Sequence, residues 1–273
     1  MNTIRIAALQ MCSRQNRDDN LRQARTLMEE ALSKGAQLIA LPENFSFLNR
    51  EGDKLSVVED LQHGPSVQML GAFARTHGVI IVGGSVPLRA GGKVTNTCLV
   101  FSAAGEIIAR YDKIHLFDIS LDEAHAFQES RHIAPGSALV TFEGYGHKMG
   151  LSICYDLRFP ELFRRLAVQG ARVLFVPSAF TWRTGSYHWE VLLRARAIEN
   201  LCYVVAPAQQ GRHNNRRESF GHTMIIDPWG QILTQAPDRP GVVVAELDFS
   251  YQQQTRQRLP CLDHVRVLHD RQT

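Results

Sequence analysis

Cysteine is scarce in this sequence and occurs in no paired motif. Five cysteines are present, an odd number, and they are widely spaced without a CxxC pair: Cys12, Cys98, Cys154, Cys202 and Cys261. Neither a disulfide framework nor a zinc site is therefore indicated. The eleven histidines include no HExxH or comparable ligand pattern, so we expect no metal. Unpaired thiols are typical of a reducing compartment, which predicts a cytoplasmic protein.

Long apolar runs and an excess of one charge are also lacking. Arg5 interrupts the N-terminal apolar run, and no uncharged apolar segment reaches the roughly 18 residues that a membrane span needs. Thirty basic and twenty-seven acidic residues leave a net charge of only +3, which is too weak to predict a nucleic-acid surface. We therefore expect no targeting signal, no membrane and no nucleic-acid partner.

The chain does contain enough apolar sequence for a large core. With 273 residues and 44% hydrophobic content, it can fold as one large α/β domain or as two fused halves. The apolar periodicity predicts strands and helices in alternation. Strands are expected at 4–9, 38–41, 79–82, 96–101, 107–111, 149–153, 202–206, 222–227 and 232–233, and helices at 16–34, between 65 and 78, after 160 and at 186–200.

The second half of the chain repeats the first. Residues 35–42 (GAQLIALP) and 170–177 (GARVLFVP) align without a gap, 135 positions apart. In each half a helix then leads into a further strand and a hairpin. Weak duplication of this kind predicts two sheets packed face to face, giving a four-layer α-β-β-α sandwich with an internal pseudo-two-fold repeat. In that arrangement Glu43 and Cys154 both lie at strand ends and share one opening.

The stretch 148–161 (KMGLSICYDLRFPE) places Cys154 where an exposed nucleophile would lie. Residues 149–153 predict a buried strand, and the polar segment that leads to Pro160 ends it abruptly. We therefore expect Cys154 at the last strand residue, the end of an α/β sheet that carries the chemistry. The competing interpretation is an inert core cysteine, because free cysteines are among the most buried residues. On this stretch alone the inert cysteine is favoured.

Three short segments resemble the Glu, Lys and Cys motifs of the nitrilase superfamily of carbon-nitrogen hydrolases. They are 41–45 (LPENF), 111–116 (YDKIHL) and 150–161 (GLSICYDLRFPE), in that family's order and at similar separations. The resemblance covers nearly the whole chain. It implies the same four-layer sandwich, a single domain over 1–273 with its core at 1–250 and a C-terminal tail at 251–273, and a homodimer.

The resemblance also implies catalytic roles. Cys154 would attack an amide carbonyl and form a thioester, with Glu43 as the general base and acid. Lys113 would stabilise the oxyanion and favour the thiolate, with the backbone N–H of Tyr155 as the second donor. Glu129 resembles a second family glutamate that positions Lys113 and substrate; the competing interpretation is a solvated loop carboxylate. No cofactor is expected, because thiol, carboxylate and ammonium suffice for amide hydrolysis.

Several loops resemble one branch of the family, whose members hydrolyse the amide of deaminated glutathione to 2-oxoglutarate and cysteinylglycine. These loops predict substrate contacts at Arg158, Phe180, His188 and Arg212. The basic loop with Arg212, Arg216 and Arg217 suits a substrate that carries two carboxylates, since guanidinium groups bind carboxylates in bidentate fashion. A solvated arginine cluster is an equally good interpretation of Arg216 and Arg217.

Other functions stay open at this point. An ω-amidase acting on 2-oxoglutaramate or 2-oxosuccinamate, or an N-carbamoyl amidohydrolase, would use the same three residues. A catalytically idle scaffold that binds a metabolite would have the same fold. An idle homologue is expected to have lost one of the three residues, whereas Glu43, Lys113 and Cys154 are all present.

Overall fold

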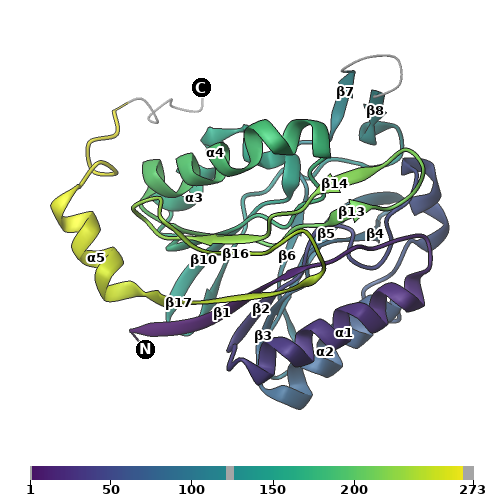
Figure 1. The fold of residues 1–273 in the computed structure, drawn as a ribbon, viewed down its shortest axis with the longest axis horizontal. Helices are drawn as coiled ribbons and strands as arrows, with labels where there is room; N and C mark the ends of the chain where they lie inside the picture. The colour runs from purple at the N-terminus through teal and green to yellow at the C-terminus, as the bar shows by residue number, and fades with distance from the viewer. Residues whose placement is uncertain (1, 121–125, 267–273) are drawn as a thin grey trace.

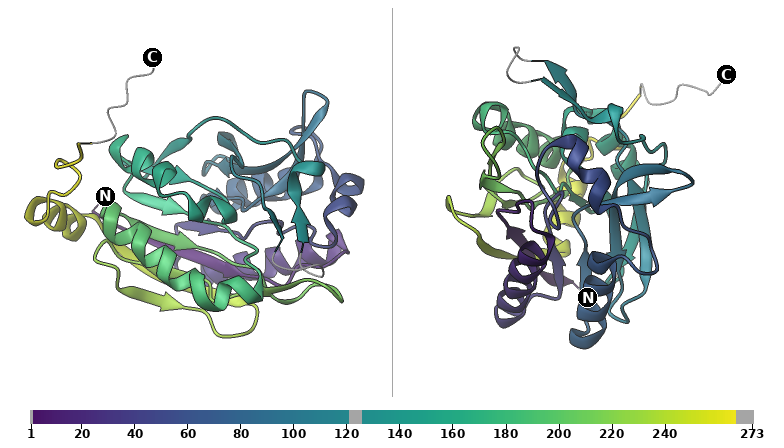
Figure 2. Two further views of the ribbon diagram at one scale, coloured as in Figure 1. Left: turned by 90° about the horizontal axis from the view of Figure 1, so that it is seen from above. Right: turned by 90° about the vertical axis from the view of Figure 1, so that its right-hand side faces the viewer.

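Two β-sheets pack face to face, and helices cover the outer face of each. The computed structural model describes residues 2–120 and 126–266. Helices α1 and α2 lie outside one sheet, and α3 and α4 lie outside the other (Figures 1 and 2). The α/β class and the four layers predicted from the repeat are confirmed.

The first sheet has seven strands in the order β17-β1-β2-β3-β5-β4, with β6 also paired to β5. Their bounds are β1 Thr3–Gln10, β2 Leu38–Ala40, β3 Ile80–Val82, β4 Val86–Ala90, β5 Lys93–Phe101, β6 Ile107–Asp112 and β17 Gly241–Asp248. Strands β1, β2 and β3 are parallel, whereas β5 and β17 run antiparallel to their neighbours.

The second sheet has six strands in the order β16-β15-β12-β11-β10-β9. Their bounds are β9 Thr141–Gly144, β10 His147–Leu151, β11 Val173–Phe175, β12 Tyr203–Ala206, β15 Met224–Ile226 and β16 Ile232–Gln235. Strands β10, β11 and β12 are parallel and β15 is antiparallel to β12, so three parallel strands followed by an antiparallel hairpin occur in both sheets. A two-fold rotation between the halves stays a prediction.

Two small ribbons lie outside the main sheets. They pair β7 (Asp118–Ser120) with β8 (Ala126–Gln128), and β13 (Gln210–Arg212) with β14 (Glu218–Phe220). Three short 3-10 helices connect other segments: η1 Glu51–Val57, η2 Glu129–Arg131 and η3 Cys154–Arg158. As the next subsection shows, residues of η1, η2, η3 and the turn after β13 surround one pocket.

Alternation along the central strands explains the layers. In β1, Ile6 and Ala8 belong to the core between the sheets, whereas Ala7 and Leu9 pack with α1 and α2. Successive strand residues point to opposite faces, and here both faces are covered, so the strands read as unbroken apolar runs. This is why their positions could be predicted without an amphipathic pattern.

Local signals set the helix ends. The helices are α1 Arg17–Ser33, α2 Pro65–His77, α3 Pro160–Val168, α4 Trp182–Asn200 and α5 Phe249–Arg258. The Asn16 side chain caps α1 by accepting from the Asp19 N–H at 3.2 Å, and α2 begins at proline and ends at Gly78 in the left-handed conformation. Helix α4 begins four residues earlier than predicted, because Trp182 and Arg183 lie in its first turn.

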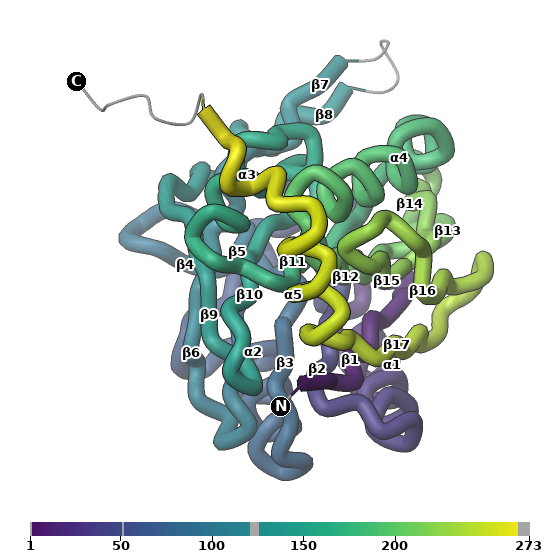
Figure 3. Tube along the Cα trace, turned by 90° about the vertical axis from the view of Figure 1, so that its left-hand side faces the viewer, coloured from purple at the N-terminus to yellow at the C-terminus, as the bar shows by residue number. Residues whose placement is uncertain are grey.

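The C-terminal segment differs from the expected tail. Strand β17 returns to the first sheet and pairs with β1 over eight residues, and Asp248 then caps α5. The predicted boundary after residue 250 falls inside α5. Gln252 donates to the carbonyl oxygens of Arg172 and Leu201 at 2.8 and 2.9 Å, which fixes α5 across the end of the second sheet (Figure 3). Residues 267–273 lie outside the described part of the chain.

Candidate active site

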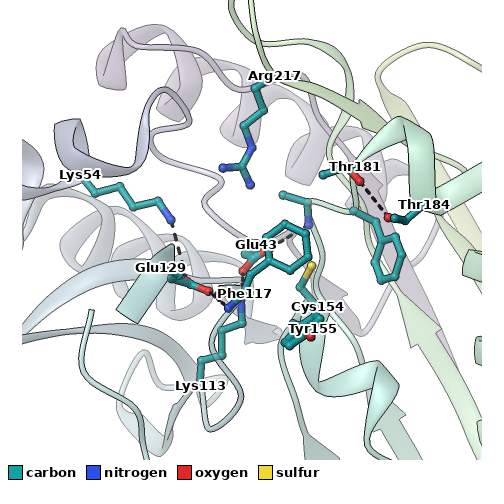
Figure 4. Close-up of a pocket in the computed structure, with 12 residues that line it drawn as sticks. Glu43, Lys54, Lys113, Phe117, Glu129, Cys154, Tyr155, Thr181, Thr184 and Arg217 are labelled. Atoms are coloured by element: carbon teal, nitrogen blue, oxygen red, sulfur yellow. Dashed lines mark hydrogen bonds and ion pairs between the residues drawn. The ribbon is translucent and has the colours of Figure 1, made fainter. Parts of the chain in front are cut away.

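Three segments that follow strands converge on one pocket (Figure 4). Glu43 lies just after β2, Lys113 directly after β6 and Cys154 shortly after β10. The pocket is lined by Glu43, Lys54, Lys113, Phe117, Glu129, Cys154, Tyr155, Ala179, Phe180, Thr181, Thr184 and Arg217. Among the described residues, Cys154 is the one cysteine that lines it.

The backbone turns sharply at Cys154. Strand β10 ends at Leu151, and Cys154 is the first residue of η3 with a φ of 48°, so the prediction that it is the last strand residue is wrong. A positive φ is unusual for a residue with a side chain and indicates a constrained turn. The Cys154 N–H donates to the Pro177 carbonyl at 3.0 Å, and the Ile153 N–H donates to the Asp156 carboxylate at 2.8 Å. These bonds hold the thiol at the pocket wall, where 6% of Cys154 is exposed.

Three donors position the Glu43 carboxylate. One oxygen accepts from Lys113 Nζ at 2.9 Å and from Asn96 Nδ2 at 3.0 Å, and the other accepts from the Ala179 N–H at 2.9 Å. Gly84 allows this arrangement: it has a φ of 56°, and a Cβ there would collide with the Pro42 carbonyl oxygen. Glu43 is thus fixed beside Lys113 before any substrate arrives.

Lys113 joins two carboxylates. Its ammonium group lies 2.9 Å from Glu43 and 2.9 Å from Glu129, and all three side chains are buried. Glu129 also accepts from the Phe117 N–H at 2.8 Å and from Asn96 Nδ2 at 3.1 Å. Lys54 Nζ approaches the same carboxylate at 4.0 Å. The predicted placement of Glu129 beside Lys113 is therefore what the structure has.

Burial and charge set the protonation states in opposite ways. Burial alone would lower the pKa of Lys113, but the carboxylates of Glu129 and Glu43 outweigh it and raise that pKa well above its usual value. Burial, followed by the Glu43 charge, raises the pKa of Cys154 far above that of a free thiol, although Lys113 and the Ala179 N–H oppose the rise. These directions keep Lys113 charged and favour the thiol form of Cys154, whereas the Lys113 charge acts in the expected direction, towards the thiolate.

Asp156 ties the Cys154 turn to the Lys113 segment. This fully buried carboxylate accepts from Tyr111 Oη at 2.6 Å, from the His115 N–H at 3.0 Å and from the Ile153 N–H. Tyr111 and His115 flank Lys113 in the chain, so one side chain sets the distance between the ammonium group and the thiol. The motif segments 111–116 and 150–161 therefore meet through Asp156 as well as through the pocket.

The other predicted contacts divide into two groups. Phe180 and Tyr155 line the pocket, with Tyr155 following Cys154 at the start of η3. Arg158 and His188 are not among the residues that line it: the Arg158 guanidinium lies over the Phe180 ring at 5.2 Å and 3.3 Å from His188 Nδ1. Arg158 therefore contacts a pocket-lining residue, and its contact with substrate stays a prediction.

Arg212 also lies outside this pocket. It is exposed on β13 and lines a neighbouring pocket instead. Sequence reasoning missed the pocket residues Lys54, Phe117, Ala179, Thr181 and Thr184, together with Asn96 behind the carboxylates, and it named Arg217 without placing it there. No periodicity or motif marks these residues, which come from loops, from η1, from β5 and from the first turn of α4.

His213 anchors the loop that carries Arg217. It is buried, with Nδ1 2.7 Å from the Ser13 carbonyl oxygen and Nε2 2.8 Å from Ser219 Oγ. Burial, with smaller contributions from the Arg217 and Arg14 charges, lowers the pKa of His213 to about 3. The imidazole is therefore neutral: Nδ1–H donates to Ser13, and Nε2 accepts from Ser219.

We expect His213 to make the folded chain acid-sensitive. Its pKa is depressed on folding, so the unfolded chain binds the proton first, and stability falls as the pH drops from about 6.5, the unfolded value, towards 3. The slope from this group approaches about 1.4 kcal/mol per pH unit. Urea unfolding between these pH values should show it, and His213→Gln, which cannot titrate, should remove that part of the slope. An unchanged slope in the variant would contradict the prediction.

The comparisons with known proteins extend over the same residues. The family model described as carbon-nitrogen hydrolase matches residues 5–257, which include Glu43, Lys113 and Cys154. The chain belongs to the carbon-nitrogen hydrolase family. Membership of this family makes it a hydrolase that acts on carbon-nitrogen bonds, and the resemblance to the nitrilase superfamily is confirmed.

Relatives of this carbon-nitrogen hydrolase include amidases of two kinds. A deaminated glutathione amidase from Synechocystis is 46% identical over 94% of this chain and 96% of its own. An omega-amidase from Danio rerio is 38% identical over 95% of this chain and 94% of its own. A crystal structure from Saccharomyces cerevisiae, described as branch 10 of the nitrilase superfamily, is 31% identical, with a TM-score of 0.87 and 95% of each chain covered.

Within residues 2–120 and 126–266, no group of three or more His, Cys, Asp or Glu side chains is arranged to hold a metal ion. In the same ranges, every helix is too short or too polar to cross a membrane.

Proposed function

We propose that this hydrolase cleaves the amide of deaminated glutathione to 2-oxoglutarate and cysteinylglycine through a thioester on Cys154. The convergence of a thiol, a carboxylate and an ammonium group on one pocket supports amide hydrolysis. The support for this particular amide is the 46% identity to a deaminated glutathione amidase over nearly the whole of both chains.

The first step joins sulfur to the amide carbon. Burial and the Glu43 charge raise the pKa of Cys154 and favour its thiol form, so Glu43 takes the thiol proton as sulfur attacks. The amide C=O becomes a single bond to an anionic oxygen. Lys113 Nζ and the backbone N–H of Tyr155, at the N-terminal end of η3, donate to that oxygen. Holding these donors in a buried pocket increases their effect, because water does not screen them.

The second step breaks the C–N bond. The tetrahedral intermediate collapses, and the protonated Glu43 gives its proton to the leaving nitrogen, so that cysteinylglycine departs as a neutral amine. The acyl group stays on sulfur as a thioester, and Glu43 is again a carboxylate. Its contacts with Ala179 N–H and Lys113 hold it in place for both transfers.

The third step hydrolyses the thioester. Glu43 takes a proton from water as the water oxygen attacks the thioester carbon, and the same two donors stabilise the second oxyanion. Collapse breaks the C–S bond and returns the proton from Glu43 to sulfur. The products are 2-oxoglutarate and the starting thiol, so one water is consumed and no cofactor enters the balance.

A substrate panel tests the proposed activity. We expect kcat/KM for deaminated glutathione to exceed that for 2-oxoglutaramate and for N-carbamoyl amino acids by about tenfold or more, the effect of about one lost charged contact. A higher kcat/KM for 2-oxoglutaramate would make the protein an ω-amidase, and turnover of none of the amides would favour the idle scaffold.

The homodimer stays a prediction of the family resemblance. Helix α4 and the turn after β15 expose apolar side chains, with Tyr187 78%, Val191 68% and Trp229 62% exposed, and a face of this kind is typical of a protein interface. We propose a homodimer, which a solution mass of twice 30.7 kDa would support and a monomeric mass would contradict. A cytoplasmic location is proposed on the unpaired cysteines alone.

A further inference from the structure

A second pocket adjoins the active-site pocket. It is lined by Phe127, Thr181, Trp182, Arg183, Arg212, Asn214, Asn215, Arg216, Arg217 and Glu218. We call it the outer pocket and the one at Cys154 the inner pocket. Thr181 and Arg217 line both, so the two spaces meet at these residues.

The outer pocket is strongly cationic. Four arginines line it against one carboxylate, that of Glu218, which lies opposite Arg212 in the β13–β14 ribbon. Arg183, Arg212 and Arg216 are exposed, whereas only 9% of Arg217 is exposed. Arginine side chains keep their charge at every pH the protein tolerates, and their planar fork matches a carboxylate. An anionic group is therefore the ligand that this surface favours.

The loop that presents these arginines is held in a defined shape. The Asn214 side chain accepts from the backbone N–H groups of Arg216 and Arg217 at 2.8 and 2.9 Å and donates to Asn49 at 3.0 Å. The residue before Asn214, His213, is held in place by its hydrogen bonds to Ser13 and Ser219. Figure 4 shows the Arg217 guanidinium directed into the inner pocket, above Glu43. The boundary between the pockets is thus built from an ordered loop, which lowers the entropy lost on binding.

The chemistry divides the substrate between the two spaces. After the C–N bond breaks, the acyl part stays bound to Cys154 in the inner pocket, whereas the amine must leave. The passage past Thr181 and Arg217 leads from the inner pocket into the outer one. An amine that carries its own carboxylate would meet the arginines there, while ammonia would not use them.

We propose that the outer pocket is the leaving-group site, where Arg212, Arg216 and Arg183 bind the carboxylate of an anionic leaving amine such as the dipeptide cysteinylglycine. This inference rests on the proposed function, because it places the C-terminal carboxylate of deaminated glutathione in the outer pocket. It makes the outer pocket the element that separates a dipeptide-releasing amidase from an ammonia-releasing one with the same three catalytic residues.

The test compares substrates with one acyl group and different leaving groups. These are deaminated glutathione, the same compound with its C-terminal carboxylate converted to an amide, and 2-oxoglutaramate. The variants are Arg212→Gln, Arg216→Gln and the double variant. The control is Arg165→Gln, which removes the same charge from an exposed position on α3 that lines neither pocket.

We expect the ratio of kcat/KM for deaminated glutathione to kcat/KM for 2-oxoglutaramate to fall roughly tenfold in the double variant, as when a charged contact is lost. In the wild type, kcat/KM should be lower by a similar factor for the C-terminal amide than for deaminated glutathione. In the double variant, kcat/KM for these two substrates should differ little. The control should keep the wild-type ratio.

Two outcomes overturn the inference separately from the proposed function. In the first, the wild type hydrolyses deaminated glutathione, but the ratio of kcat/KM for deaminated glutathione to that for 2-oxoglutaramate is the same in the double variant and in Arg165→Gln. The outer pocket would then not be the leaving-group site, whereas the proposed activity would stand. Equal losses on all three substrates in the double variant would mean a structural role for the arginines. Failure of the wild type to hydrolyse deaminated glutathione would overturn both proposals.

Discussion

Replacing Cys154 by alanine should abolish amide hydrolysis and leave the chain folded. The variant loses the atom that forms the thioester, and we expect kcat to fall by roughly 10⁴-fold or more, as for other catalytic nucleophiles. Alanine keeps the same Cβ at the turn with φ 48°, and the N–H bond to Pro177 does not involve the side chain. Removal of one buried sulfur costs about 1–2 kcal/mol of stability.

A second buried cysteine supplies the matched control. Cys202, at the end of α4, has a thiol whose pKa is raised by burial to about 11, and it does not line the active-site pocket. Cys202→Ala should cost a similar free energy of unfolding and keep activity within about twofold, because small core changes act through stability. Amide hydrolysis at the wild-type rate in Cys154→Ala would refute the proposal that Cys154 is the catalytic nucleophile.

A trapping experiment addresses the intermediate directly. Acid quenching during turnover, followed by mass spectrometry of peptides, should find the 2-oxoglutaryl group on the peptide that contains Cys154. An enzyme in which water attacks the amide directly would leave that peptide unmodified throughout turnover. This result would be evidence against the thioester even if Cys154→Ala were inactive.

Replacing Glu43 by glutamine should remove most of the activity while making the thiol more acidic. The carboxylate is proposed to move a proton in every step, so we expect kcat to fall by about 10²- to 10⁴-fold, with a smaller effect on KM. The negative charge of Glu43 also raises the pKa of Cys154, so its removal lowers that pKa. A variant with more Cys154 thiolate but slower hydrolysis would show that the proton transfer by Glu43 matters more for kcat than its charge effect on the thiol.

The measurement for Glu43→Gln is the alkylation rate of Cys154 against pH beside kcat for the amide. The pH at which alkylation rises should be lower in the variant than in the wild type. Glu129→Gln is the control, since it makes the same chemical change on the other carboxylate bound to Lys113. We expect a smaller loss of kcat there. Equal losses in both variants would mean that the carboxylates only hold Lys113 in place.

Much of the fold could be predicted because its signals are local. Buried strands appear as short apolar runs, and proline or glycine marks helix ends such as Pro65 and Gly78, where the backbone itself requires them. The pairing of β17 with β1 was not predicted, since the paired residues are 231 to 245 positions apart and neither segment alone carries a pattern that indicates its partner. The expected tail began inside α5 for the same reason: only docking against residues 172 and 201 makes that segment part of the body.

The candidate site was predictable to the extent that each residue sits in a recognisable segment. Glu43, Lys113 and Cys154 were singled out because the segments 41–45, 111–116 and 150–161 resemble the three motifs of the family. Lys54 and Asn96 lie in no such segment, yet Asn96 donates to both carboxylates and Lys54 approaches that of Glu129. The packing of the Arg158 guanidinium over the Phe180 ring could not be predicted either, because it joins η3 to a segment that lies beside it only in the folded chain.

The sequence alone determined which groups are available and what each peptide segment prefers to form, because side-chain chemistry and short-range backbone preferences belong to single residues and their neighbours. Only the tertiary structure decided that Lys113 is shared by two carboxylates, that burial raises the pKa of the Cys154 thiol, and that Arg217 lines two neighbouring pockets. These properties depend on distance and burial, and both arise only when segments remote in the chain are packed together.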